Sequence, residues 1–184
     1  VQFIEPDAPP TLAHDESASM IGTDTSRWSF PGNNSGVVSI AQLDSGIDNA
    51  HQGLQIVGWG WDFTGANNPW TDGCEHGSHV LGTLLGSGNG SPSNSLKGVA
   101  PGLARGGSAT RAYITRAFDN ACNSSGTALA TLLSVNRNGF WDGFGNTTKP
   151  VLSNNSWGTM GTGWFGTEAD ARTLDAEVWN YDQT

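Results

Sequence analysis

The sequence contains little lysine and little positive charge overall. Only two of its 184 residues are lysines, Lys97 and Lys149, and 8 Lys and Arg residues stand against 17 Asp and Glu residues, which gives a net charge of -9. Binding to nucleic acid or to an anionic membrane surface depends on clustered positive charge. The composition therefore predicts no nucleic-acid partner and no membrane partner.

Long apolar runs are also lacking. A membrane-spanning helix needs about 18 or more consecutive apolar residues, and no such run occurs here. No basic segment followed by an apolar one opens the chain, so we expect it to carry no signal peptide. The 26 glycines and the many Ser, Thr and Asn residues suit a loop-rich protein, and together with the scarcity of lysine they favour an extracellular location.

Strand-like and helix-like patterns alternate along the chain. Runs of apolar and β-branched residues predict buried strands, and apolar residues three or four positions apart predict helices. The strands are expected at residues 37–43, 110–118 and 150–155, and the helices at 76–86, 125–138 and 167–181. Such alternation is typical of a mostly parallel central sheet with helices on both faces. We therefore predict a three-layer α/β fold for residues 35–184, preceded by an irregular, proline-interrupted arm at 1–34.

Two residues that can act together in proton transfer stand at the ends of these elements. Asp44 ends the first strand and is followed at once by Ser45 and Gly46, whereas His76 stands in the first turn of the first helix. Sites in parallel sheets lie at the carboxyl ends of the strands. A carboxylate and an imidazole are two parts of a relay that activates a nucleophile, so Asp44 and His76 are candidate catalytic residues.

The motifs around both residues resemble those of the subtilases, the subtilisin-like serine proteases. The matching segments, in order along the chain, are VVSIAQLDSGID, HGSHVLGT, LKGVAPG and VLSNNSWG. The resemblance covers residues 35–184 and implies a serine endopeptidase that hydrolyses peptide bonds in proteins, with Asp44 and His76 in an Asp-His-Ser triad. It implies protein or peptide substrates and no cofactor for catalysis.

Two parts of the subtilase pattern do not occur in these residues. The family carries its nucleophilic serine in a GTSMA-like block and its oxyanion asparagine in an AAGNE-like strand, and the sequence contains neither. The resemblance therefore implies the N-terminal half of a peptidase domain at 35–184, incomplete and inactive without its C-terminal half as partner. Residues 1–34 would include the end of a propeptide, because VQFIEP resembles the last strand of one.

By the same resemblance, two segments would form the edges of a substrate cleft. Ser156, Trp157 and Gly158 would pair with extended substrate as one edge, a form of strand addition. Ser125 and Gly126 would form the opposite edge. The alternatives are an ordinary strand end and an ordinary loop.

Several positions depart from the family pattern. Ser78 replaces a threonine and keeps the hydroxyl group, whereas Glu75 replaces a glycine directly before His76. Gly53 stands where subtilases often have a calcium-binding aspartate, so a structural calcium ion is not supported by the residues here. His79, three residues after His76, is interpreted as a core histidine without a catalytic role.

The two cysteines, Cys74 and Cys122, are placed where they could meet. Cys74 precedes His76 by two residues, and Cys122 follows the strand at 110–118, which in a parallel sheet ends on the same side as Asp44. A disulfide is geometrically feasible, and some subtilases are similar in pairing cysteines at these two places. Two free thiols are the alternative.

Three other functions stay open at this point. A zinc site could use Cys74, His76 and His79 with Asp72 or Glu75. The LDSG turn also fits an aspartic protease, although that chemistry needs a second carboxylate and no second D[ST]G occurs. A subtilase-like domain without its serine could instead be a non-catalytic peptide-binding module.

Overall fold

The described part of the chain is built on one parallel sheet. The computed structural model describes residues 39–55, 58–94, 96–101, 112–138, 140–141, 147–150, 152–157, 171–176 and 179. The strands of the sheet are β1 (Ile40–Asp44), β2 (Gly58–Asp62), β3 (Ala112–Arg116) and β6 (Leu152–Asn154), in the order β2-β3-β1-β6. All three pairings are parallel.

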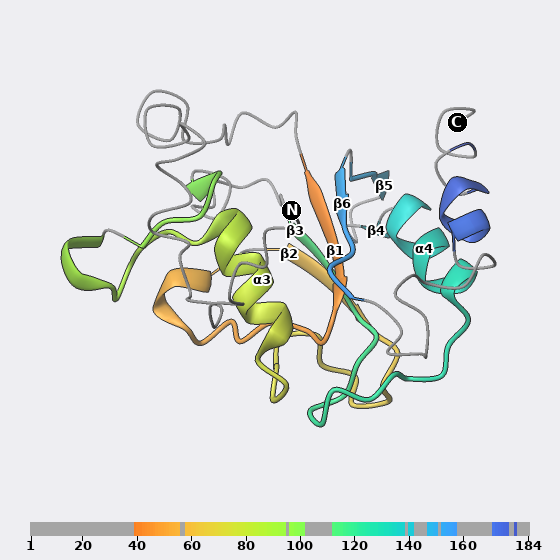
Figure 1. The fold of residues 1–184 in the computed structure, drawn as a ribbon, viewed down its shortest axis with the longest axis horizontal. Coiled ribbons are helices and arrows are strands. Elements are labelled where there is room, and N and C mark those ends of the chain that lie inside the picture. The colour runs from red at the N-terminus through yellow and green to blue at the C-terminus, as the bar shows by residue number, and fades with distance from the viewer. Residues whose placement is uncertain are drawn as a thin grey trace, which may run out of the picture.

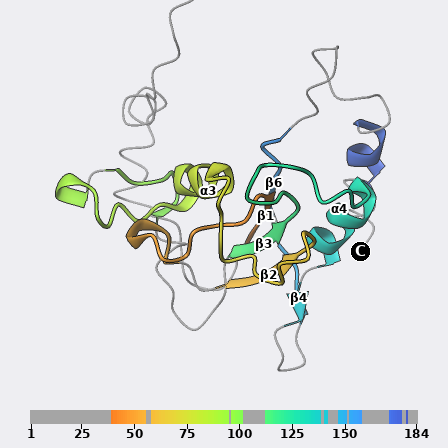
Figure 2. The same cartoon turned by 90° about the horizontal axis from the view of Figure 1, so that it is seen from below.

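Helices cover both faces of this sheet. Helix α3 (His76–Leu85) lies on one side and α4 (Leu129–Asn138) on the other, as seen in Figure 1 and from below in Figure 2. The smaller elements are the 3-10 helices η1 (Gln52–Leu54) and η2 (Pro92–Asn94), the antiparallel pair β4 (Phe140–Trp141) and β5 (Thr147–Thr148), and a helical segment at 171–176. The predicted three-layer α/β fold with a mostly parallel central sheet is therefore confirmed.

Side chains alternate between the two faces of the sheet. On β3, Ile114 packs in one apolar cluster with Leu81 and Leu85 of α3, whereas Tyr113 packs with Val135 of α4. The same alternation along β1 places the side chain of Leu43 on the α4 face of the sheet, where it packs against α4. Burial of each such Leu or Ile stabilises the fold by about 1.5–3 kcal/mol, which fixes both helices on the sheet.

Several elements are shorter than the sequence pattern predicts, among them the strand expected at 110–118, which ends at Arg116. The helix expected at 125–138 begins only at Leu129, because Gly126 has a φ of 75°, which a right-handed helix cannot contain. The strand expected at 150–155 is shortened to Leu152–Asn154. This strand, β6, is the last strand of the described sheet, and Leu152 is 58% exposed. The edge of the described sheet is therefore partly apolar.

A row of charged side chains crosses the carboxyl end of the sheet. Register pairs Arg116 of β3 with Asp44 of β1 on one side and with Asp62 of β2 on the other. Arg116 is 2% exposed and turns its guanidinium toward Asp62, which leaves Asp44 to another partner. The Arg116 side chain donates to Asp62 Oδ2 (3.2 Å), Asn68 O (3.1 Å), Thr71 Oγ1 (3.2 Å), Asn120 Oδ1 (2.7 Å) and Phe118 O (3.4 Å).

The Asp62 carboxylate predicts a sensitivity to acid. Burial of Asp62 raises its pKa, but hydrogen bonds from Thr64 and the Asn68 N–H, with the charge of Arg116, outweigh burial and hold the pKa below its ordinary value of 3.8. Stabilisation from a carboxyl group with a lowered pKa is complete above its unfolded pKa and is lost as the pH falls through the folded one. We expect the unfolding free energy to fall below about pH 4, and to fall less steeply in Asp62→Asn. Urea titrations of both proteins between neutral pH and acid measure the two slopes, and equal slopes would contradict the expectation.

Among the described residues, no helix combines the length and the apolar character needed to cross a membrane.

Candidate active site

The structure brings Asp44 and His76 together. Asp44 lies on the α3 face of β1, two residues after Gln42, whose amide donates to the carbonyl of Gly77 in the first turn of α3 (2.9 Å). His76 Nδ1 lies 2.8 Å from Asp44 Oδ1. The side chain of Asp44 is 1% exposed and that of His76 is 48% exposed. The buried carboxylate therefore accepts a hydrogen bond from the Nδ1–H group of His76, and the rest of the ring is partly exposed to solvent.

Close backbone packing sets the position of the imidazole. A side chain at Gly77 would clash with the carbonyl oxygen of Gly46, so the start of α3 lies directly on the turn that follows β1. Gly46 itself has a φ of 101°, which favours glycine. Two glycines thus allow a strand end and a helix start to approach closely enough for Asp44 to reach His76.

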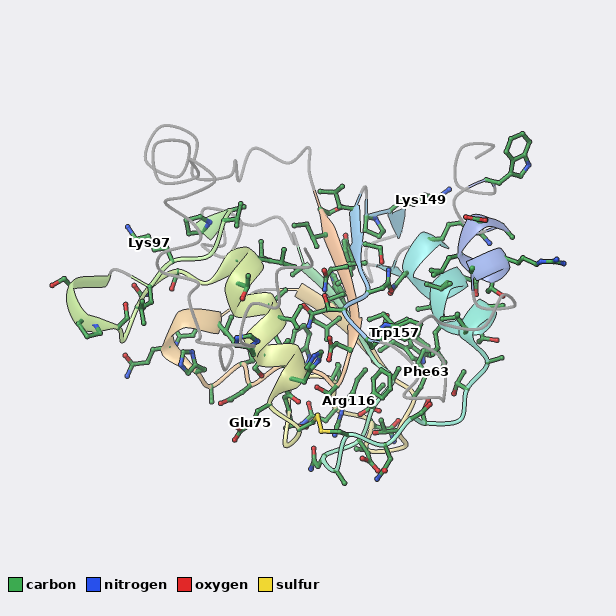
Figure 3. The ribbon with its side chains drawn as sticks, viewed as in Figure 1. Phe63, Glu75, Lys97, Arg116, Lys149 and Trp157 are labelled. Carbon is green, nitrogen blue, oxygen red and sulfur yellow. A yellow bond between two sulfur atoms is a disulfide. The ribbon has the colours of Figure 1, made fainter. Side chains whose placement is uncertain are left out.

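A disulfide and the side chain of Asn120 join the loop before His76 to the loop after β3. Cys74 and Cys122 form a disulfide in the structure, with Cα atoms 5.2 Å apart, and the bond lies beside Arg116 at the lower end of the molecule in Figure 3. Asn120 Oδ1 accepts from the N–H of Gly73 (3.0 Å) and from Arg116 (2.7 Å). The segment that leads into His76 is therefore tied down at two neighbouring points.

We expect the disulfide to be measurable as a contribution to stability. Thiol titration of the denatured, unreduced protein should detect no free thiol, because the structure leaves no cysteine unpaired among the described residues. A bond that closes a loop of this sequence separation, 48 residues, should stabilise the fold by about 2–4 kcal/mol. The double variant Cys74→Ser, Cys122→Ser should lose that amount in a urea titration. Two free thiols in the unsubstituted protein would contradict the assignment.

Glu75 stands directly before His76 in a left-handed conformation. Its φ is 67°, and its side chain makes no hydrogen bond to the helix start. In Figure 3 it lies below α3, whereas Lys97 lies to its upper left and Lys149 to its upper right. A non-glycine residue with positive φ carries backbone strain, which accounts for the glycine that the family pattern favours here.

Replacing Glu75 by glycine should therefore stabilise the protein. The left-handed conformation costs a residue with a side chain about 1–2 kcal/mol. Glycine avoids this cost but loses more conformational entropy on folding, which cancels part of the benefit. We therefore expect the unfolding free energy to rise by about 0.5–1 kcal/mol. Thermal unfolding of Glu75→Gly measures it. Asn67→Gly is the matched control, because Asn67 also has a positive φ of 53° but asparagine adopts that region readily. A loss of stability in Glu75→Gly would contradict the strain argument.

The two segments expected to bind substrate both contact the residues that follow β3. The N–H of Ser125 donates to the carbonyl of Ala117 (2.7 Å), and Gly126 beside it is exposed. In the other segment, the Trp157 ring lies 6.2 Å from that of Phe118, and Ser156 donates to the side-chain oxygen of Asn154 (3.1 Å).

Gly158, the third residue expected at that edge, lies outside the described residues.

Two interpretations of neighbouring residues are wrong. His79 is exposed rather than a core residue, because it lies on the outer side of α3 while Leu81 and Leu85 face the sheet. The zinc alternative loses its thiolate ligand, because Cys74 is in the disulfide.

Asp72, another candidate zinc ligand, already accepts hydrogen bonds at both oxygens, from Ser45, Glu75 and Ser78. No group of three potential metal ligands occurs among the described residues. At Gly53, where subtilases often have a calcium-binding aspartate, a side chain would meet the ring of His51.

Sequence reasoning did not assign a role beside Asp44 and His76 to three residues that shape this site. Arg116 and Asp72 are buried and charged, and Ser45 is buried between Asp44 and Asp72. A signal was present for Arg116, since an arginine inside the apolar strand AYITRAF must find a buried partner. For Asp72 and Ser45 the sequence carried no comparable signal.

Comparison with known proteins gives partial matches to subtilisins. Subtilisin from Bacillus pumilus is 40% identical over 67 residues, which are 36% of this chain and 23% of that protein. Subtilisin E from Bacillus subtilis is 41% identical over 64 residues, which are 35% of this chain and 16% of that protein. This chain thus spans less than a quarter of these relatives.

The fold also matches a solved structure. The crystal structure of a psychrophilic subtilisin-like protease from the Antarctic psychrotroph Pseudoalteromonas sp. AS-11 superposes with a TM-score of 0.58 at 21% identity. The match covers 86% of this chain and 33% of that one. A model of the subtilase family matches residues 35–183, nearly the whole of the predicted α/β domain, and the chain therefore belongs to the subtilase family.

Proposed function

We propose that this chain supplies the aspartate and the histidine of a subtilisin-like serine endopeptidase. The observation that carries the proposal is the 2.8 Å contact between a buried carboxylate, Asp44, and a half-exposed imidazole, His76. Membership of the subtilase family supports a protease of the serine type. The substrates proposed are proteins and peptides, and catalysis is proposed to need no cofactor.

In this mechanism His76 takes up and returns one proton, while Asp44 orients the imidazole ring. Asp44 holds the Nδ1 proton, which leaves the lone pair on Nε2 of His76. Nε2 takes the proton of a serine hydroxyl as the serine oxygen attacks the peptide carbonyl carbon, and later returns it to the nitrogen of the leaving amine. The buried carboxylate stabilises the imidazolium that exists between the two transfers. The serine would come from outside these 184 residues, which hold no GTSMA-like block.

The two segments that contact Ala117 and Phe118 are proposed to bind the substrate backbone. Ser125 and Gly126 would form one edge, and Ser156, Trp157 and Gly158 the other, so that an extended peptide is held as an added strand. The acidic composition and the disulfide between Cys74 and Cys122 support an extracellular location, where disulfides persist.

Complementation tests this function. The purified 184-residue protein should hydrolyse no peptide substrate, because it has a base but no nucleophile. Addition of a polypeptide that carries the GTSMA-like and AAGNE-like segments of the parent protease should produce a peptidase, and a serine-directed organophosphate should abolish its activity. Peptidase activity of the 184 residues alone, resistant to that reagent, would show that the proposed mechanism is wrong.

A non-catalytic peptide-binding module is the second candidate. Gly126 and Ser156, at the two proposed edges, are exposed and could pair with an extended peptide without any nucleophile. One measurement separates the two candidates, because a binding module would bind peptides to the 184 residues alone and leave them uncut even after the complementing polypeptide is added. The aspartic-protease alternative is not retained, because the chain belongs to the subtilase family.

A further inference from the structure

A second buried carboxylate, Asp72, lies beside the Asp44–His76 pair and has no part in the mechanism above. Asp72 is 8% exposed and precedes α3 by four residues. Its Oδ1 accepts from the hydroxyl of Ser45 (2.8 Å) and from the N–H of Glu75 (3.0 Å). Its Oδ2 accepts from the N–H and the hydroxyl of Ser78, both at 2.7 Å. Four donors therefore hold this carboxylate in a single orientation at the start of α3.

Ser45 connects Asp72 to the candidate catalytic pair. The Ser45 oxygen accepts the N–H of Gly77, the residue after His76, at 2.9 Å. It lies 2.8 Å from Asp72 Oδ1 but 3.3 Å from Asp44 Oδ1. A hydroxyl group has one proton to donate, and the shorter distance assigns that proton to Asp72.

This assignment decides how many donors compete for Asp44. With the hydroxyl proton on the Asp72 side, Asp44 Oδ1 keeps two close donors, the N–H of Ser45 and Nδ1 of His76, both at 2.8 Å. If Asp72 did not draw the proton away, the hydroxyl would turn to Asp44 Oδ1 as a third donor. The bond to His76 would then weaken, because three donors would share one oxygen.

We propose that Asp72 is a positioning residue for His76, which acts through Ser45. It keeps the Ser45 hydroxyl proton away from Asp44 Oδ1 and anchors the first turn of α3, so that the imidazole stays aligned on the carboxylate. The proposal rests on the proposed function for its effect on catalysis. The alignment itself can be measured without activity.

The test compares Asp72→Asn with the unsubstituted protein in the complemented peptidase. An amide cannot accept from all four donors, so the Ser45 hydroxyl should turn toward Asp44. We expect kcat to fall about 10- to 100-fold with an unchanged KM, as for a displaced catalytic group. In proton NMR, the Nδ1–H resonance of His76 should shift relative to that of the unsubstituted protein.

Ser78→Ala is the matched control. It removes a hydrogen bond to the same carboxylate but leaves the link from Asp72 to Ser45, so kcat and the Nδ1–H resonance should both stay unchanged. A folded Asp72→Asn protein with an unchanged resonance and an unchanged kcat would overturn the proposal. So would a Ser78→Ala protein that reproduces the whole effect of Asp72→Asn, because the role of Asp72 would then be to cap the helix.

Ser45 supplies a second test that does not depend on the folding of Asp72→Asn. Ser45→Ala should lower kcat and shift the resonance, and Ser45→Thr, which keeps the hydroxyl, should restore both. Ser45→Ala with native values would overturn the proposal. If the complemented protein proves inactive, the proposed function fails, but the NMR comparison still decides whether Asp72 and Ser45 align His76.

Discussion

Replacing Asp44 by asparagine should lower kcat of the complemented peptidase by about 10⁴-fold, the loss typical of a triad aspartate. An asparagine side chain fits the same buried space, but its amide can donate to Nδ1 of His76. The ring would then carry its proton on Nε2, where it cannot take the proton of the serine. Steady-state kinetics at neutral pH measure the effect, and KM should change little because Asp44 is buried and does not contact substrate.

Asp48→Asn provides the control for this prediction. Asp48 lies four residues further along, is exposed, and accepts only local hydrogen bonds, among them one from the N–H of Ala50 (3.0 Å). Loss of its charge should leave kcat unchanged. An Asp44→Asn protein with nearly full activity would mean that the carboxylate does not orient the imidazole during catalysis.

Replacing Arg116 by leucine should destabilise the protein by about 3–5 kcal/mol, the cost of leaving one partner of a buried ion pair behind. Both side chains are almost fully inaccessible, at 2% exposure for Arg116 and 1% for Asp62. The substitution would leave the Asp62 carboxylate in a buried site without its counter-charge. It would also remove the donor that holds Asn120 beside the loop before His76. Urea-induced unfolding at neutral pH measures the loss.

The double variant Arg116→Leu, Asp62→Leu separates charge from packing. If the cost comes from the uncompensated carboxylate, removal of both charges should recover a large part of the lost stability, since apolar replacements of a buried pair are often nearly neutral. A double variant as unstable as the sum of the two single variants would contradict this explanation.

Much of the fold could be predicted from sequence because its cause is local. The apolar run at 37–43 predicts a buried strand, and the spacing of the apolar residues after His76 predicts a helix with one buried face. Each element buries side chains at a regular spacing, and that spacing is visible in the sequence. Asp44 and His76 were recognisable for a related reason, since both stand directly at an element boundary. The helix at 125–138 was predicted too long, because the pattern of apolar residues did not reveal the positive φ of Gly126.

The sequence by itself determined the layer architecture, the family and the two candidate catalytic residues. Each of these depends on neighbouring residues along the chain, whose pattern a periodicity or a motif captures. Only the tertiary structure decided which buried charges meet. Arg116 and Asp62 are 54 positions apart, and Ser45 and Asp72 are 27 apart. Strand register brings Arg116 beside Asp62, and the close contact of Gly77 with Gly46 brings Ser45 beside Asp72. A buried charge is stabilised by the group that the packed fold places within hydrogen-bonding distance, and the sequence does not reveal that group.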